Sequence, residues 1–167
     1  KIKSAKKKPL YKKKKLKIQK REEQKKNVLK VAEFVQDMPN KNVIMSGSDL
    51  EDGFDLKIIA EAIEEVAQGC LKLGVRLHYH NHAWEFKDNA KIFKALVEYA
   101  PSLYFALDLG WVYAGGFDPI KIVEEHKDRI SYVHLRDANE NKEFVNLGEG
   151  IFDYSKLMEV LKEVLGK

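Results

Sequence analysis

Short apolar stretches alternate with amphipathic helical patterns along most of this chain, and the alternation has a nearly constant period. Expected strands begin near residues 42, 75, 103 and 131, which lie 33, 28 and 28 residues apart, and each interval holds one helical pattern. Parallel strands need such crossover connections, because a helix must carry the chain back to the start of the next strand. The repeat therefore predicts an α/β fold with a parallel sheet, whose polar sites gather at the carboxyl ends of the strands.

Apolar spacing and helix stop signals give the bounds of the expected elements. We expect strands over 42–45, from 75 through the histidines that come next, over 103–108 and over 131–137. We expect helices over about 22–37, from 56 to a stop at Gly74, over 92–100, from 119 onward and over 152–165. Pro39 and Pro101 follow two of these helices, and Pro119 after Asp118 suits the first turn of another.

The second expected strand carries three of the five histidines of the chain at every second position. Side chains of a strand alternate between its two faces, so His78, His80 and His82 are expected to point to the same side. A row of imidazoles is costly to bury without hydrogen-bond partners. We therefore interpret this stretch as the edge of an active site, with His78, the deepest of the three, in a structural role.

Two further strands end on groups that could share a metal ion with this stretch. Asp108 ends the third strand, and His134 shares a face of the fourth strand with Arg136. Taken alone, His134 suits a core or loop position and Asp108 suits a turn. Together with His80 at matching strand ends, they predict a site for Mn²⁺, Co²⁺, Fe²⁺ or Zn²⁺, and the absence of thiolate ligands favours a catalytic over a structural metal.

Other candidate residues lie next to these strand ends. Trp84 and Trp111 are expected in the loops after two of the strands, where they either line a sugar pocket or pack in the core. Glu149, between Gly148 and Gly150, is either a poised carboxylate or part of a plain turn. His126, in a polar helix-end segment, is expected at the surface.

The charge of the chain divides it into two regions of opposite sign. Residues 1–26 hold 14 Lys and Arg against two Glu, and residues 27–167 hold 16 against 24 Asp and Glu, which is +12 followed by −8. We expect the first region to be a low-complexity tail, disordered or a frayed helix, that is either solvated or a nucleic-acid attachment. The acidic second region argues against binding to nucleic acid.

Cysteine and hydropathy indicate the compartment. Cys70 falls among apolar residues at helical spacing, which suits a small buried hydrophobe better than a reactive thiol. No apolar run reaches the roughly 18 residues that a membrane span needs, and no apolar segment follows the basic start of the chain. We expect a soluble cytoplasmic protein with no membrane partner.

Four segments carry a resemblance to a known family: GVRLHYHNHAWEF, LYFALDLGWVYAGGFDP, RISYVHLRDA and NLGEGIFDYSKLMEVLK. In this order and spacing, over 27–167, they resemble the xylose isomerase-like TIM barrel family of sugar phosphate isomerases and epimerases, which is also related to endonuclease IV. The resemblance covers only the units around strands four to seven of an eight-unit barrel. It implies a partial, half barrel of parallel β/α units, preceded by the Lys-rich tail.

The resemblance also implies a function and a set of site residues. Family members use a divalent metal, such as Mn, Co, Mg, Fe or Zn, to isomerise or epimerise a sugar or sugar phosphate through an enediolate. Asp108 and His134 match metal ligands of the family, and either His80 or Glu85 takes the place of the first ligand. The implied catalytic residues are His82 and Glu85, and the implied substrate-binding residues are Trp84, Trp111, Arg136 and Glu149.

A half barrel leaves two sheet edges and one sheet face without partners. We therefore expect either a homo-oligomer that completes the barrel or a non-catalytic, inactive barrel fragment. The runner-up activity is that of an endonuclease IV-like phosphodiesterase on DNA, although that family uses more metal-binding His, Asp and Glu residues than this chain offers.

Overall fold

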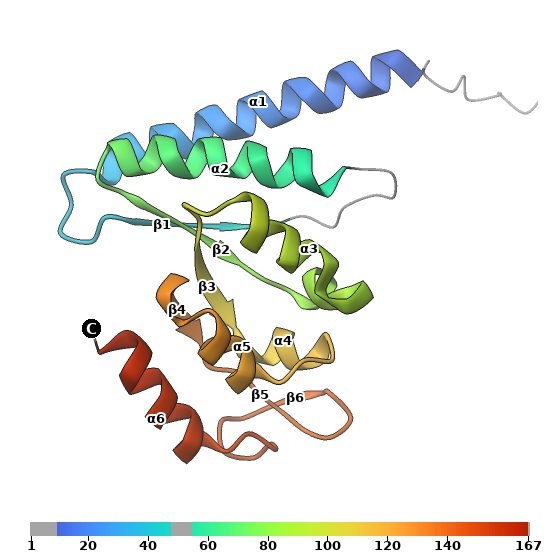
Figure 1. The fold of residues 1–167 in the computed structure, drawn as a ribbon, viewed down its shortest axis with the longest axis vertical. Coiled ribbons are helices and arrows are strands. Elements are labelled where there is room, and N and C mark those ends of the chain that lie inside the picture. The colour runs from blue at the N-terminus through green and yellow to red at the C-terminus, as the bar shows by residue number, and fades with distance from the viewer. Residues whose placement is uncertain (1–9, 48–54, 167) are drawn as a thin grey trace, which may run out of the picture.

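The predicted parallel sheet is present. The computed structural model describes residues 10–47 and 55–166, and in them four strands form one sheet of order β1-β2-β3-β4 with every pairing parallel (Figure 1). The strands are β1 (Asn42–Ser46), β2 (Arg76–His80), β3 (Tyr104–Asp108) and β4 (Ile130–His134). A parallel sheet of four consecutive βα units is the arrangement of a partial TIM barrel.

Helices connect these strands in the order that the repeat predicts. They are α1 (Leu10–Val35), α2 (Leu56–Lys72), α3 (Lys87–Tyr99), α4 (Leu109–Ala114), α5 (Pro119–Glu125) and α6 (Tyr154–Leu165). Two short 3-10 turns, η1 (Ala83–Phe86) and η2 (Lys127–Arg129), and an antiparallel pair, β5 (Asp137–Ala138) and β6 (Phe144–Val145), complete the described part of the chain.

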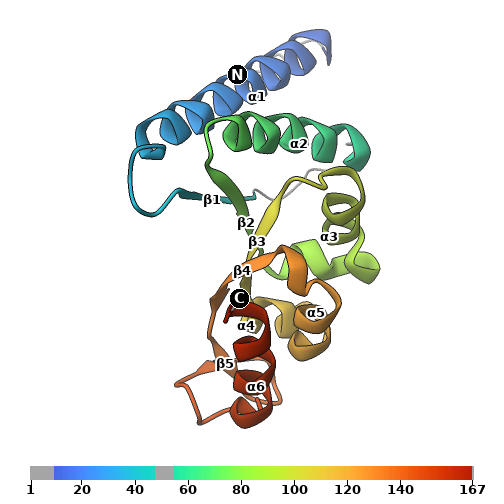
Figure 2. The same cartoon turned by 60° about the vertical axis from the view of Figure 1, so that its left-hand side comes forward.

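The hydrophobic core lies between the sheet and the helices, which succeed one another along the sheet in Figures 1 and 2. Leu77, Phe105 and Leu107 are fully buried there, whereas their neighbours on the other face include His78 and His80. The Tyr132 hydroxyl on β4 accepts a hydrogen bond at 3.1 Å from Asn40, which precedes β1. Side chains from the two edges of the sheet therefore meet, which shows that the sheet is curled. The face that carries the histidines is therefore the concave one, as in a barrel interior.

Capping residues explain where the helices begin and end. Asp55, Asp118 and Asp153 are the N-caps of α2, α5 and α6, and each carboxylate accepts a backbone N–H of the first turn. Gly74, with φ of 69°, follows the end of α2 as predicted. Pro119 is the first residue of α5, which confirms that prediction as well.

The helix α1 begins earlier than the amphipathic pattern indicates. That pattern predicted a helix from about residue 22, after a tail that was either disordered or a frayed helix. α1 starts at Leu10, which agrees with the helical alternative, and it crosses the expected boundary between 26 and 27 without a break. Lysine is a good helix former, and Lys25 forms an ion pair with Glu65 while Leu29 lies against Gly69 of α2. The Lys-rich segment is thus helical from Leu10 onward, and residues 1–9 lie outside the described residues, as do Ser48 and Asp49 of the loop predicted after β1.

Several predicted boundaries were wrong at the carboxyl ends of the strands. β2 ends at His80 and β4 at His134, so His82 and Arg136 lie beyond the strands that were expected to contain them. The helix α4 was not predicted, and it contains Trp111, which was expected in a loop. Its first turn is closed by the Asp108 carboxylate, an N-cap that sequence spacing alone does not distinguish from a turn former.

Two predictions away from the strand ends have different outcomes. Cys70 is buried, as expected, and burial raises the pKa of its thiol to about 11. His126 was expected at the surface but is half-buried, with its ring edge-on to Phe93 at 5.2 Å between centroids. In the ranges that the structure describes, no helix combines the length and the apolar character that crossing a membrane requires.

Candidate metal centre

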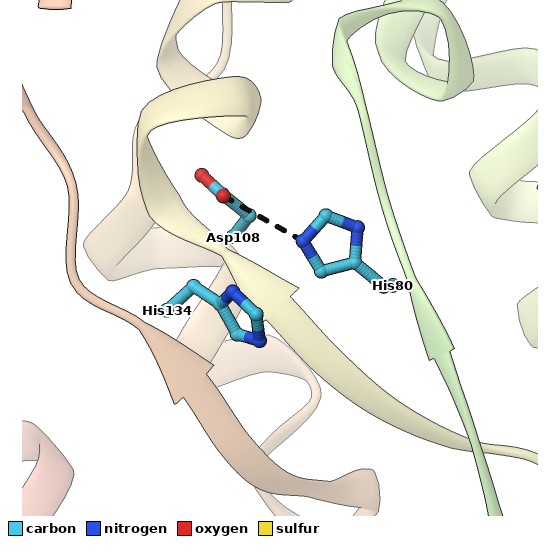
Figure 3. A group of neighbouring side chains, drawn as sticks. All are labelled: His80, Asp108 and His134. Atoms are coloured by element: carbon cyan, nitrogen blue, oxygen red, sulfur yellow. Dashed lines mark ion pairs between the residues drawn. The ribbon is translucent and has the colours of Figure 1, made fainter. Parts of the chain in front are cut away.

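Three strand ends bring their side chains together on the concave face. His80 comes from the end of β2, Asp108 from the end of β3 and His134 from the end of β4 (Figure 3). One ligand atom from each residue lies within 4.8 Å of the others. The strand register produces this grouping, because Asp108 pairs with His134 and His80 pairs with Ala106, two residues before Asp108.

The distances in this cluster suit a divalent ion. His80 Nε2 lies 3.6 Å from Asp108 Oδ2, and the rings of His80 and His134 are 4.6 Å apart between centroids. Ligand atoms that each lie about 2.0–2.2 Å from one ion have a comparable separation. Two imidazoles and one carboxylate are a donor set of first-row divalent metals such as Mn²⁺, Fe²⁺, Co²⁺ and Zn²⁺, so the residues present fit such an ion.

The carboxylate of Asp108 is held in one orientation by its neighbours. Its Oδ1 accepts the backbone N–H of Trp111 at 3.1 Å, which leaves Oδ2 on the side of His80. Asn81 forms two hydrogen bonds with the Asp108 backbone, accepting its N–H at 2.8 Å and donating to its carbonyl at 3.2 Å. Asp108 and Asn81 are both fully buried, so the strand end that presents Oδ2 is rigidly positioned.

Asn81 is a site residue that sequence reasoning missed. Its position between His80 and His82 could have indicated its role. Successive side chains of a strand point to opposite faces, so Asn81 faces away from the histidines and lies next to the neighbouring strand. An amide in that buried position must have partners. The end of the third strand offers them.

Electrostatics favour the form of His80 that can bind a metal. Burial lowers the pKa of His80, and the positive charge of a protonated His134 lowers it further, against the opposing effect of Asp108. A lowered pKa keeps the imidazole neutral at neutral pH. Since a metal-binding histidine must be neutral, His80 is in a suitable state.

His82 follows the end of β2, but its ring still lies beside the cluster. Its backbone is extended, with φ of −122° and ψ of −172°, and its ring lies 5.2 Å from that of His80. The ring stacks on Trp84 at 4.0 Å and 14°, and Trp111 lies 6.0 Å away. Among the described residues, neither His82 Nδ1 nor Trp84 Nε1 has a hydrogen-bond partner, although both atoms are buried. An aromatic wall with two unpaired polar atoms thus borders the cluster.

Glu85 is not part of the cluster that His80 joins. It is fully buried, and its Oε1 accepts from the Tyr79 hydroxyl at 2.8 Å while Oε2 accepts the His82 N–H at 2.7 Å. Burial raises the pKa of Glu85 despite these hydrogen bonds. His80 and Glu85 were the two candidates for the first metal ligand. The structure brings His80 close to Asp108 and His134. Glu85 instead accepts a hydrogen bond from the His82 backbone and stabilises the turn that contains His82.

The loop around Glu149 is organised by a different carboxylate. Asp137 is fully buried, and its Oδ2 accepts the N–H groups of Gly148 and Gly150, both at 3.0 Å. Glu149 is exposed and accepts a hydrogen bond from Asn146 at 3.0 Å. The structure therefore does not bring Glu149 into the cluster, and Asp137 is a second buried polar residue that sequence reasoning missed.

Arg136 does contact the cluster. It reaches the cluster from the short segment between β4 and β5. Its Nε donates to Asp108 Oδ2 at 3.1 Å, so this oxygen has both an arginine and His80 beside it.

Comparison with known proteins identifies the family of the chain. Residues 16–164 match the model of the xylose isomerase-like TIM barrel family. The chain belongs to this family. The predicted membership is thereby confirmed, and the four-stranded parallel sheet accounts for part of the barrel of a family member.

Curated relatives and solved structures agree with this membership. An inosose dehydratase from Geobacillus kaustophilus is 35% identical over 82 residues, which are 48% of this chain and 27% of that protein. An inosose dehydratase from Clostridium tetani is 27% identical over 138 residues, 72% of this chain and 46% of that protein. A sugar phosphate isomerase/epimerase from Parabacteroides distasonis shares the fold, with a TM-score of 0.71 at 18% identity, over 87% of this chain and 54% of that chain. The chain thus spans about half, or less, of the length of these proteins.

Proposed function

We propose that this chain provides the metal site of a divalent-metal-dependent enzyme that isomerises or epimerises a sugar or sugar phosphate. The observation that carries the proposal is the cluster of His80, Asp108 and His134, which three consecutive parallel strands bring within 4.8 Å of one another. Family membership supports it, because the structural relatives include a sugar phosphate isomerase/epimerase.

In this proposal the cluster holds the ion and the residues around it handle the substrate. His80, Asp108 and His134 would hold Mn²⁺, Co²⁺, Mg²⁺, Fe²⁺ or Zn²⁺, and such an ion would supply the Lewis-acid chemistry that makes the C–H next to a substrate carbonyl more acidic. His82 is the proposed base, because its ring lies 5.2 Å from that of His80, beside the cluster. Trp84, whose ring stacks on His82, and Trp111 form the proposed aromatic wall against the sugar.

The curated relatives suggest a second candidate, dehydration. Both named relatives are inosose dehydratases. Removal of the proton next to a carbonyl is a first step that dehydration shares with isomerisation, and the two outcomes differ in the next step: loss of a neighbouring hydroxyl as water, or return of a proton. His82 has the same role in both, so a test of proton removal covers both candidates.

The experiment is deuterium incorporation. The chain with Mn²⁺ is incubated in D₂O with a panel of ketoses, ketose phosphates and cyclic polyol ketones, and proton NMR monitors the hydrogens next to the carbonyl. We expect metal-dependent loss of one such signal for at least one compound, and a loss of rate of about 10²–10⁴-fold in His82→Gln. His126→Gln is the matched control, because it removes a histidine away from the cluster.

Two results would contradict the proposal. Metal-bound protein that exchanges no hydrogen in any of these compounds would favour the non-catalytic fragment, and cleavage of an abasic duplex would favour the endonuclease IV-like alternative. We do not favour the latter, because residues 27–167 carry a charge of −8, which repels DNA.

We also propose that a second copy of the chain completes the barrel. β1 and β4 are the two edge strands of the sheet, and each has exposed apolar side chains nearby. Phe34 on α1, which precedes β1, is 72% exposed, and Leu147, which comes after β4, is 57% exposed. Because both edges are parallel strands, β1 of one copy suits β4 of another, and the metal cluster would then lie inside a closed wall.

A further inference from the structure

A second cavity lies between the α4–α5 loop and the start of α6. Its volume is about 620 Å³, which is within the range of small-molecule sites. Its walls come from the end of α4, the loop that follows, the first turn of α5, the β5–β6 hairpin and the first turns of α6. Within the described part of the chain, its lining includes no residue of the metal cluster and none of the aromatic wall beside it. The cavity is therefore separate from the metal centre.

The body of this cavity is apolar. Three aromatic side chains that line it, Tyr113, Phe117 and Phe152, are only half-buried. Tyr113 and Phe152 come from different segments, and their rings meet edge to face at 5.5 Å between centroids. Ile151, another lining residue, is 46% exposed. A flat apolar ligand would bury this partly exposed surface, and such burial favours binding.

Four charged residues of the described chain line the cavity, two aspartates and two lysines. The two carboxylates are engaged, because Asp118 and Asp153 are the N-caps of α5 and α6 and accept backbone N–H groups of the first turns. Their negative charge thus compensates the positive end of each helix dipole. Lys142 and Lys156 are both exposed, and their ammonium groups supply the charge that remains for a ligand.

The β5–β6 hairpin holds Lys142 at the edge of the aromatic surface. Lys142 has a φ of 65°, and its N–H donates to the carbonyl of Asn139 at 2.9 Å in the hairpin turn. Its ammonium group lies 5.9 Å from the centre of the Tyr113 ring and donates to the carbonyl of Ala114 at 3.3 Å. That carbonyl uses one of the three N–H donors of the ammonium group. A positive charge with spare donors therefore lies beside an apolar cavity.

We propose that this cavity binds an organic anion with a flat apolar body, of the class of aromatic carboxylates. The body lies against Tyr113, Phe117 and Phe152, and the anionic group contacts Lys142 and Lys156. No residue of this site belongs to the metal cluster, so the proposal goes beyond the proposed function and does not depend on it.

The test compares an anionic probe with a neutral probe of the same shape. 2-Naphthoate and 2-naphthylmethanol share one ring system and differ in charge. Isothermal titration calorimetry measures the binding of each to the intact chain without added metal. We expect one naphthoate per chain, bound about three- to tenfold more tightly than the alcohol, since ion pairs at exposed lysines are weak. The difference should shrink in 1 M NaCl, which screens exposed charges.

Variants assign the preference to the two lysines. Lys142→Asn combined with Lys156→Gln should remove the difference between the probes, and asparagine is used at 142 because it tolerates a positive φ. Lys162→Gln is the matched control, because it removes the same charge from the last turn of α6 and should keep the difference. Phe152→Leu should weaken the binding of both probes, because it removes a ring from the cavity wall.

Amide NMR spectra of the parent chain locate the probe without relying on any variant. Naphthoate should shift the amide signals of Gly116 and Ile151, which line the cavity, and leave those of His80 and His134 unchanged. Four results would each overturn the site: no binding of naphthoate, equal affinity for the two probes, a difference that survives in the double variant, or shifts confined to residues around the metal cluster. None of these results bears on the metal centre.

Discussion

At the scale of single residues, Asp108 connects the parts of the site. One oxygen caps α4, the other faces His80 and Arg136, and the backbone on either side is bound to Asn81. A metal-binding carboxylate usually depends on such outer contacts for its orientation. The buried Asn81 amide is therefore expected to influence the metal although it cannot reach it.

Replacing Asn81 tests this dependence. Asn81→Ala removes both hydrogen bonds to the Asp108 backbone, and it should lower the free energy of unfolding by about 1–3 kcal/mol. Metal affinity should fall by about 10–100-fold, because Asp108 loses its fixed position. Urea unfolding and metal titration measure the two effects. Loss of stability with unchanged metal affinity would show that Asn81 supports the fold but not the site.

The half-buried His126 predicts how stability depends on pH. Burial lowers its pKa and Arg129 lowers it further, against the opposing effect of Glu125. A histidine with a lowered pKa in the folded state takes up a proton more readily when unfolded, so its contribution to stability is lost as the pH falls below about 6.5. Urea melts between pH 5 and pH 8 should therefore show a smaller loss toward low pH in His126→Gln than in the parent chain. Identical slopes would contradict the packing of His126 against Phe93.

At the scale of elements, the sequence predicted the strands better than the segments that connect them. Apolar runs such as that around Phe105 mark strands because each is buried against helices, and that pattern is local. The segments after β2 and β4 depend on distant partners: Glu85 bonds to Tyr79 beneath a turn, and Asp137 bonds to Gly148 and Gly150. No spacing rule indicates such contacts, and for this reason the choice between His80 and Glu85 as the first metal ligand stayed open and Asp137 was overlooked.

Asp137 offers a test at this scale. Its carboxylate accepts three backbone N–H groups, from Ala138, Gly148 and Gly150, and Asp137→Ala would leave them without that acceptor. We expect a loss of about 2–4 kcal/mol in the free energy of unfolding, with a smaller loss in Asp137→Asn. Limited proteolysis should cut the segment 139–150 faster in the alanine variant. An alanine variant as stable and as resistant as the parent chain would show that the loop does not depend on this residue.

At the scale of the whole molecule, the sheet has the form of half a barrel. Its concave face holds the three residues of the candidate metal cluster (Figure 3), and hydrogen bonds between Tyr132 on β4 and Asn40 before β1 connect its two edges. The two edge strands have no neighbours in the chain as described. The strand register of the sheet is enough to bring the three residues of the cluster together. Four strands do not form a closed barrel, however, so additional strands are needed to enclose a substrate.

Association into dimers is the corresponding prediction. Sedimentation analysis should show a concentration-dependent dimer, and Phe34→Gln should weaken it, because this exposed ring lies on the helix before the edge strand β1. Ile58→Gln, which replaces another exposed apolar residue, on α2, is the control and should leave association unchanged. A monomer at all concentrations that unfolds cooperatively would refute the completed barrel.

The most direct test of the metal site is a metal titration. Calorimetry with Mn²⁺ and Co²⁺ on the intact chain should show one ion bound per chain, because His80, Asp108 and His134 converge from three strand ends. His134→Ala and Asp108→Asn should each abolish binding, while His126→Gln should bind as the parent chain does. A chain that binds neither ion, or that binds it equally well without His134, would contradict the metal site on which the proposed function depends.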